Sequence, residues 1–155
     1  MSDVEVTKII AATPEQLYAL VSDLPRMGEW SPENHGGKWI QGATGPAVGA
    51  KFKGKNSHGW RRWSTLATVV LADPGREFAF DVKAAGLKVA QWGYRLSAVD
   101  EGTAVTEYWT DHRSPLIAKL TGAVAGVSDR NAHNRAGMEH TLERLAAAAL
   151  AADGA

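Results

Sequence analysis

One acidic residue, Glu107, occupies a position where a strand is expected to face the core. Val105, Glu107 and Trp109 are spaced two residues apart, so they share one face of the predicted strand. A carboxylate between two inward apolar side chains is costly unless it is paired. We favour a structural ion pair with an arginine. The candidate partners are Arg61, Arg62 and Arg135. The alternative is an acid of raised pKa in a pocket, which would make Glu107 the candidate catalytic acid–base group.

Two amides interrupt an apolar stripe farther along the chain. At 100° per residue, Asn131 and Asn134 fall on the same helical face as a series of apolar residues. The apolar members are Leu116, Leu120, Val124, Val127, Met138, Leu142, Leu145 and Ala149. A buried amide without partners costs roughly 1–3 kcal/mol. The two amides therefore indicate that this helix closes over a cavity that holds water or a ligand.

The other residues that could do chemistry form no recognisable catalytic or metal site. His133 and His140 would lie about 10 Å apart on a helix face opposite the stripe, too far to share one ion. His58 and His112 are expected to be exposed at strand ends, and either could assist Glu107 only at a pocket mouth. The chain has no cysteine, so a thiolate nucleophile and a Cys-ligated metal are excluded. We predict no metal and no cofactor.

The bulk composition is that of an ordinary globular domain, with 45% apolar and 22% charged residues. Seventeen basic residues balance seventeen acidic ones, so nucleic acid is not an expected partner. No apolar run reaches the length of a membrane span, and the first residues lack a signal-peptide pattern. We therefore expect a cytoplasmic protein without integral membrane association. Residues 1–150 should form one domain, followed by a disordered tail over residues 151–155. The sequence leaves the oligomeric state open.

Short β segments separated by turns dominate the middle of the chain. The predicted strands cover residues 4–11, 38–41, 51–57, 60–71, 77–82, 89–99 and 103–111. Thr13 and Gln16 form a capping box that begins a helix reaching Leu24, and residues 26–30 can form a second short helix. A meander of strands followed by a helix predicts an antiparallel sheet covered on one face.

The last helical segment is too long to be straight. Thirty-four residues would span roughly 50 Å, whereas a compact chain of this size is about 40 Å across. Gly122 and Gly126 are the expected place of a break. We predict a short helix over residues 115–121 and a main helix over residues 128–149.

Alternation assigns the inward face of most strands. One further inward set contains Trp92, Tyr94 and Leu96, and another contains Phe78, Phe80 and Val82. In the strand that contains Trp63 two faces are possible, one with Trp63, Thr65, Ala67 and Val69, the other with Leu66 and Val70.

Several short segments occur in the order typical of one protein superfamily. They are Ile10-Ala11-Ala12-Thr13-Pro14-Glu15-Gln16-Leu17, Glu29-Trp30-Ser31-Pro32, the loop over residues 45–52, and Gly102-Thr103-Ala104-Val105-Thr106-Glu107. The end of the chain, with Met138, Thr141-Leu142 and Arg144-Leu145, fits the same pattern. Together they resemble the START-like, Bet v 1-like (SRPBCC) superfamily, specifically its polyketide cyclase/dehydrase group, over nearly the whole chain. Residues 62–65 and 74–78 resemble a subgroup of actinobacterial members.

The resemblance implies an α+β helix-grip fold. In that fold a seven-stranded antiparallel sheet curls around a long C-terminal helix, two short helices follow the first strand, and a hydrophobic cavity lies between sheet and helix. Fold membership does not settle function, because members include carriers, receptors and cyclases.

Our leading hypothesis is a protein that binds a hydrophobic or aromatic small molecule, lipid-like or polyketide-like, in this cavity. The candidate ligand-binding residues are Trp63, Phe78, Phe80, Trp92, Tyr94, Glu107, Trp109, Asn131, Asn134 and Met138. The first alternative is a cofactor-independent cyclase or dehydratase acting on a polyketide-like substrate. The second is an adaptor that binds a protein partner.

Overall fold

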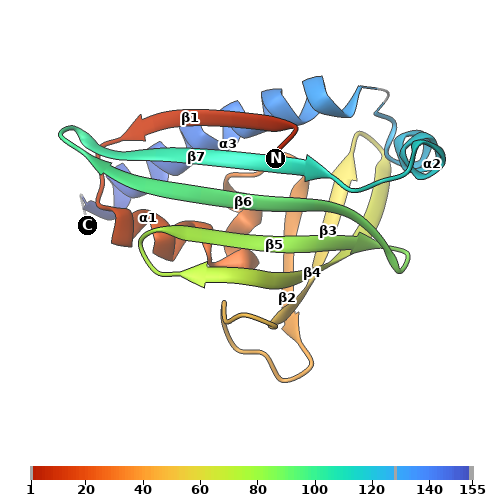
Figure 1. The fold of residues 1–155 in the computed structure, drawn as a ribbon, viewed down its shortest axis with the longest axis horizontal. Coiled ribbons are helices and arrows are strands. Elements are labelled where there is room, and N and C mark those ends of the chain that lie inside the picture. Colours follow the sequence, from red (N-terminus) through yellow and green to blue (C-terminus); the bar gives the residue numbers. More distant parts are fainter. Residues whose placement is uncertain (1, 128, 154–155) are drawn as a thin grey trace.

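Seven antiparallel strands form one strongly curved sheet in the computed structural model, which describes residues 2–127 and 129–153 (Figure 1). The strands are β1 (Val4–Ile10), β2 (Asn34–Ile40), β3 (Lys51–His58), β4 (Arg61–Asp73), β5 (Glu77–Ala84), β6 (Leu87–Val99) and β7 (Gly102–Asp111). Their spatial order is β1-β7-β6-β5-β4-β3-β2. Strands β2 to β7 therefore form a meander in which each strand pairs with the next one along the chain, and β1 pairs with β7. The predicted α+β helix-grip fold is confirmed.

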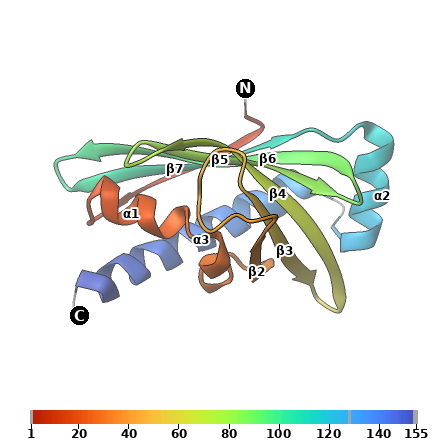
Figure 2. The same ribbon diagram turned by 90° about the horizontal axis from the view of Figure 1, so that it is seen from below.

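Two short helices lie between β1 and β2, as predicted. Helix α1 (Pro14–Val21) begins at the Thr13–Gln16 capping box, in which each side chain bonds the other residue's backbone N–H. A 3₁₀ helix, η1 (Leu24–Glu29), follows. Both helices lie on the same side of the sheet as the last helix (Figure 2).

The C-terminal helical segment breaks at Gly126, one of the two glycines expected there. Helix α2 (Pro115–Ala125) ends at Gly126, whose φ of 74° is left-handed and whose N–H bonds the carbonyl of Gly122. A side chain at Gly126 would collide with the Arg61 guanidinium, since its Cβ would lie 2.8 Å from Nη1. Helix α3 (Arg130–Asp153) then crosses the concave face of the sheet (Figure 2). Ser128, the predicted helix start, lies outside the described residues.

The last helix continues beyond its predicted end. Positions 151–153 of the predicted tail belong to α3, and residues 154–155 lie outside the described part of the chain.

No described helix has both the length and the apolar character that a membrane span requires.

The predicted inward faces are confirmed. Phe78 and Phe80 on β5, Tyr94 on β6, and Val105 and Trp109 on β7 are all buried. The ambiguous strand β4 turns the Trp63 face inward, because Ala67 and Val69 are buried whereas Val70 is exposed. A register shift between Val69 and Leu71 lies at this point of the β4–β5 pairing.

The predicted apolar stripe is wrong at its first two residues. Leu116 and Leu120 are 66% and 55% exposed, whereas Val127 is buried. The break at Gly126 redirects the chain, so α2 does not continue the face that α3 presents to the sheet. On the other side of the break, Met138 and Leu142 are buried as expected. The side chain of Val124 lies outside the described part of the chain.

A candidate ligand-binding cavity between the sheet and the last helix

A cavity of about 570 Å³ lies between the concave face of the sheet and α3. This volume is in the range of pockets that bind small molecules, roughly 300–1,000 Å³. Its mouth lies at one end of the molecule, where Leu87, the first residue of β6, and Leu120 of α2 line it and are both exposed. Figures 1 and 2 both place α2 and the β5–β6 turn at this end.

Eight of the ten predicted ligand-binding residues line the cavity. Six come from the sheet, namely Trp63, Phe80, Trp92, Tyr94, Glu107 and Trp109, and two come from α3, namely Asn134 and Met138. The rings of Trp92 and Trp109 pack at 6.3 Å between centroids, on adjacent strands. Among these eight residues, five aromatic rings and Met138 accompany the carboxyl group of Glu107 and the amide of Asn134.

The structure places the other two predicted residues elsewhere. Asn131 is exposed and does not line the cavity. Asn131 shares a helical face with Asn134, as predicted, but it lies in the first turn of α3, beside the cavity mouth. Its side chain therefore stays exposed although the face was assigned correctly. Phe78 is fully buried in the core, where its ring packs 6.0 Å from Phe80 and 6.1 Å from Tyr18.

Glu107 is a buried acid in the cavity, and the favoured ion pair is wrong. Its side chain is 2% exposed, and no described arginine pairs with it. Arg61 instead lies over the ring of Trp60, and Arg135 donates to the backbone carbonyl of Glu5. Burial raises the pKa of Glu107 to about 8, partly opposed by a hydrogen bond that the Tyr94 hydroxyl donates to its carboxyl group. In the described residues, Oε2 of Glu107 has no hydrogen-bond partner.

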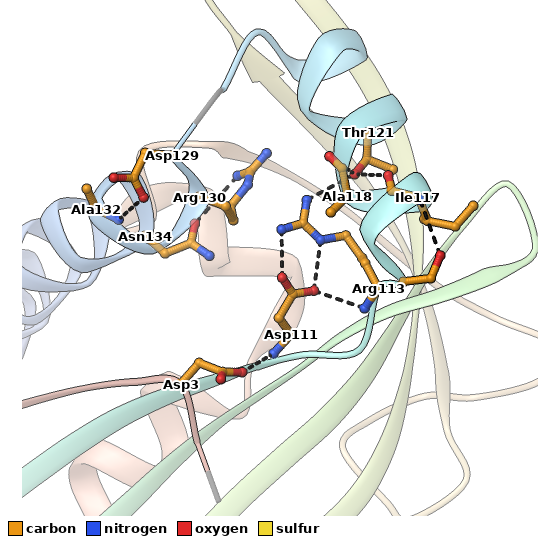
Figure 3. A network of polar contacts seen from close by, with 11 residues as sticks. Asp3, Asp111, Arg113, Ile117, Ala118, Thr121, Asp129, Arg130, Ala132 and Asn134 are labelled. Carbon is orange, nitrogen blue, oxygen red and sulfur yellow. Dashed lines mark hydrogen bonds and ion pairs between the residues drawn. The ribbon is translucent and has the colours of Figure 1, made fainter.

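Asn134 is another buried polar group in the cavity wall. It is 5% exposed, and its Oδ1 is 3.5 Å from Nη1 of Arg130. Its Nδ2 has no hydrogen-bond partner in the part of the chain that the structure describes. Figure 3 shows its amide next to Arg130, to which a dashed line joins it. The sequence-based expectation of a buried amide in this helix thus holds for Asn134 and fails for Asn131.

Two arginines that the sequence analysis did not single out line the cavity near its mouth. Arg113 forms two hydrogen bonds of 2.8 Å with the carboxylate of Asp111, and its Nη1 donates to Thr121 Oγ1 of α2 at 3.0 Å (Figure 3). Arg130 pairs with Glu33 at 3.0 Å. The spacing of Asp111 and Arg113, two residues apart at the end of a strand, was the available signal for the first pair.

The histidines are arranged differently from the prediction. His133 lines the cavity and its Nε2 is 3.0 Å from Glu33 Oε2, although its helix face was expected to point away. The ring of His58 packs edge-on against His133 at 4.8 Å. His58 and His112 are exposed and do not line the cavity. Across the described ranges, no three histidine, aspartate or glutamate side chains gather as a metal-binding group.

A family model described as polyketide cyclase/dehydrase and lipid transport matches residues 1–150. No curated protein matches the chain. Among solved structures, a Polyketide_cyc-like protein from Corynebacterium glutamicum is 35% identical, with 93% of this chain and 80% of that one covered and a TM-score of 0.51.

Two further structures share the fold at low sequence identity. The di-domain ARO/CYC protein StfQ of the steffimycin biosynthetic pathway is 14% identical, with a TM-score of 0.74 over 98% of this chain and 51% of that one. A Chromobacterium violaceum protein is 13% identical, with a TM-score of 0.72 over 96% and 98% of the two chains.

Proposed function

The chain belongs to the polyketide cyclase/dehydrase and lipid transport family, and we propose that it binds a hydrophobic or aromatic small molecule in the cavity between the sheet and α3. The observation that carries this proposal is the cavity itself, of about 570 Å³, with tryptophan, phenylalanine and methionine in its walls. Flat aromatic surface with an occasional polar group is typical of sites that hold apolar ligands.

The size of the cavity supports a role for it. Loss of packing in cavities destabilises proteins by about 24 cal/mol per Å³. For a volume of about 570 Å³, a dry void would forfeit on the order of 10 kcal/mol. A whole domain is stable by only about 5–15 kcal/mol. Space on this scale is therefore filled by water or by a bound molecule and is not a result of imperfect packing.

The tryptophans provide a direct test without any mutation. Trp63, Trp92 and Trp109 line the cavity, whereas Trp30, Trp39 and Trp60 do not. We would titrate ¹⁵N-labelled protein with the neutral apolar dye N-phenyl-1-naphthylamine and follow the six indole N–H signals. Binding in the cavity predicts saturable shifts of the first three signals and little change in the other three. Shifts confined to the other three, or no saturable shift, would contradict the proposal.

A cavity-filling variant is a second test. Ala67 faces inward on β4 and lines the cavity, while its neighbour Thr68 does not. Ala67→Phe should weaken dye binding at least about ten-fold, because the new ring occupies the same space as the ligand. Thr68→Phe is the matched control on the opposite face and should bind within about two-fold of wild type. Circular dichroism establishes that both variants are folded.

Glu107 favours a second candidate function, a cofactor-independent cyclase or dehydratase acting on a polyketide-like substrate. A carboxyl group inside the cavity with a pKa of about 8 can donate or accept a proton near neutral pH. In dehydration of a β-hydroxy ketone, a base removes the α-proton, the C=C bond forms, and an acid protonates the departing hydroxyl, which leaves as water. We would assay 4-hydroxy-4-phenylbutan-2-one, whose dehydration product absorbs in the ultraviolet. Catalysis requires turnover that Glu107→Gln abolishes while dye affinity is retained, and equal rates in both proteins would exclude this role.

A further inference from the structure

Two buried side-chain atoms in the described residues lack a hydrogen-bond partner, and both belong to the cavity wall. They are Oε2 of Glu107 and Nδ2 of Asn134. Their side chains are 2% and 5% exposed. An unpartnered buried polar group costs about 1–3 kcal/mol, so two such groups in one cavity indicate ligand atoms that complete their hydrogen bonds.

The topology separates these two atoms along the cavity. Trp109 of β7 and Met138 of α3 belong to one buried cluster, and the two elements run in opposite directions (Figure 1). Glu107 lies two residues before Trp109, and Asn134 lies one helical turn before Met138. Glu107 and Asn134 therefore lie on opposite sides of this cluster along the cavity. From the rise of a strand and of a helix, the separation is on the order of 10 Å.

The two ends differ in their surroundings. Asn134 lies at the end with the mouth, beside Arg113 and Arg130, whose charges are matched by Asp111 and Glu33. Glu107 lies at the inner end, where Tyr94 bonds one of its oxygens and no described cation pairs with it. A negative group beside Glu107 would be repelled and desolvated together with it.

The chemistry of each atom determines which ligand group can form a hydrogen bond with it. The amide nitrogen of Asn134 only donates, so it needs a ligand oxygen that accepts. Glu107 can donate from a carboxylic acid or accept as a carboxylate. An alcohol or phenol satisfies Glu107 in both forms, whereas an ether satisfies only the acid and a hydrocarbon satisfies neither.

We infer that the ligand is an elongated, largely apolar molecule that carries uncharged oxygen groups at two ends on the order of 10 Å apart, a hydroxyl group at Glu107 and a hydroxyl or carbonyl oxygen at Asn134. This inference rests on the proposed function, because it describes the occupant of the same cavity. It excludes plain hydrocarbons and molecules whose inner end carries a carboxylate, sulfonate or phosphate.

The test uses three matched probes of one shape. They are 2,6-dihydroxynaphthalene, 2,6-dimethoxynaphthalene and 2,6-naphthalenedicarboxylate. Each probe is titrated by calorimetry at about pH 9, where Glu107 is mostly a carboxylate, which accepts from a hydroxyl group and gains nothing from an ether. The indole N–H signals of Trp63, Trp92 and Trp109 report binding in the cavity. A hydrogen bond of about 1 kcal/mol corresponds to about five-fold in affinity. Asn134 can donate to either probe, so the difference between them comes from Glu107. We expect the wild type to prefer the diol over the dimethyl ether by about five-fold or more, and the dicarboxylate to bind more weakly than both.

Variants assign the binding contributions to the two residues. Glu107→Leu should reduce the diol preference by about five-fold. Asn134→Leu should instead weaken the diol and the dimethyl ether alike by about five-fold, because both oxygens accept a hydrogen bond from its Nδ2. Thr106→Leu, on the opposite face of β7 and outside the cavity wall, should leave the preference unchanged. The wild-type comparison needs no variant, so it decides the matter even where a variant fails to fold.

Four results would overturn the inference: equal affinity of the wild type for the diol and the ether, tighter binding of the dicarboxylate, an unchanged preference in Glu107→Leu, or unchanged affinity for both probes in Asn134→Leu. Failure of the proposed function is a different result. In that case no naphthalene probe, the dimethyl ether included, shifts the signals of Trp63, Trp92 and Trp109.

Discussion

The hydroxyl of Tyr94 donates a hydrogen bond to the carboxyl group of Glu107, its directly paired residue on the neighbouring strand. The β6–β7 pairing aligns the two positions, and both side chains enter the cavity. The carboxyl group therefore has one partner from the protein and one oxygen, Oε2, that has none among the described residues. This arrangement holds the acid in place while leaving it able to bond a ligand.

Removing the Tyr94 hydroxyl should raise the pKa of Glu107 above about 8. The hydrogen bond from Tyr94 stabilises the carboxylate and so opposes the effect of burial. The pKa of Glu107 can be measured in Tyr94→Phe by following its carboxyl ¹³C signal against pH. Tyr108→Phe is a matched control, because the Tyr108 hydroxyl donates to Glu77 instead, at 2.6 Å. A lower or unchanged pKa in Tyr94→Phe would show that the hydrogen bond does not favour the carboxylate.

Protein stability should fall as the pH rises towards 8, and Glu107 should be one cause. Its pKa is raised from 4.5 to about 8 by burial, so between these values the folded state holds a proton that the unfolded state has released. The free energy of unfolding therefore decreases as the pH rises through this window, by up to about 5 kcal/mol for this group. Below about pH 4.5 its contribution is fully present.

Glu107→Gln isolates this contribution from the other titrating groups. The amide does not titrate, so the stability of the variant relative to wild type should rise from pH 5 to pH 8 in urea unfolding experiments. If the two unfolding curves keep a constant separation over this range, Glu107 does not hold the extra proton.

The strand pattern predicted more of the site than the helix pattern did. Alternation placed Tyr94, Glu107 and Trp109 inward, because neighbouring strands and a covering helix leave each strand one buried face. The partner of Glu107 was not predictable in the same way. Which arginine approaches a buried acid depends on where Arg61 and Arg135 lie in the folded chain, and the strand period carries no information about that.

The helix pattern failed where the chain changes direction. Asn131 and Asn134 share a helical face, but only Asn134 lies where α3 covers the sheet. The angle around a helix is set by local geometry, whereas burial depends on how far the opposing sheet extends. Leu116 and Leu120 were misplaced for a related reason, since the glycine break was predicted and the new direction of α2 was not.

Gly93 should not tolerate even an alanine. A Cβ at this position would lie 2.2 Å from Cζ of Tyr108, which is held by its hydrogen bond to Glu77 and by the Arg95 guanidinium 4.6 Å from its ring. Displacing the ring should destabilise the protein by about 1–3 kcal/mol in urea unfolding. Gly45→Ala, with nothing within 4 Å of its Cβ, is the control and should change stability by less than about 0.5 kcal/mol. Equal stability of the two variants would contradict this packing.

Arg113 should hold α2 in its place at the cavity mouth. Its guanidinium joins Asp111 at the end of β7 to Thr121 in the second half of α2. In Arg113→Ala, hydrogen exchange of the amides over residues 117–125 should become faster, because this link between sheet and helix is lost. Lys119→Ala changes an exposed cation of the same helix and should leave the exchange rates unaltered. Unchanged protection in Arg113→Ala would show that other contacts hold α2.

Asn134→Leu should make the ligand-free protein more stable and a poorer binder. Nδ2 of Asn134 has no partner in the described residues, and its Oδ1 contact with Arg130 is long at 3.5 Å. Leucine removes the unpartnered donor from the cavity wall, which should raise the free energy of unfolding by about 1 kcal/mol. Thr141→Val is the matched control on the same helix face, because Thr141 also lines the cavity but its hydroxyl donates to the Gly137 carbonyl at 2.8 Å. That variant should gain nothing. A site kept for ligand binding at the expense of stability predicts this contrast between the two residues, and a loss of stability in Asn134→Leu would show that the amide serves the fold instead.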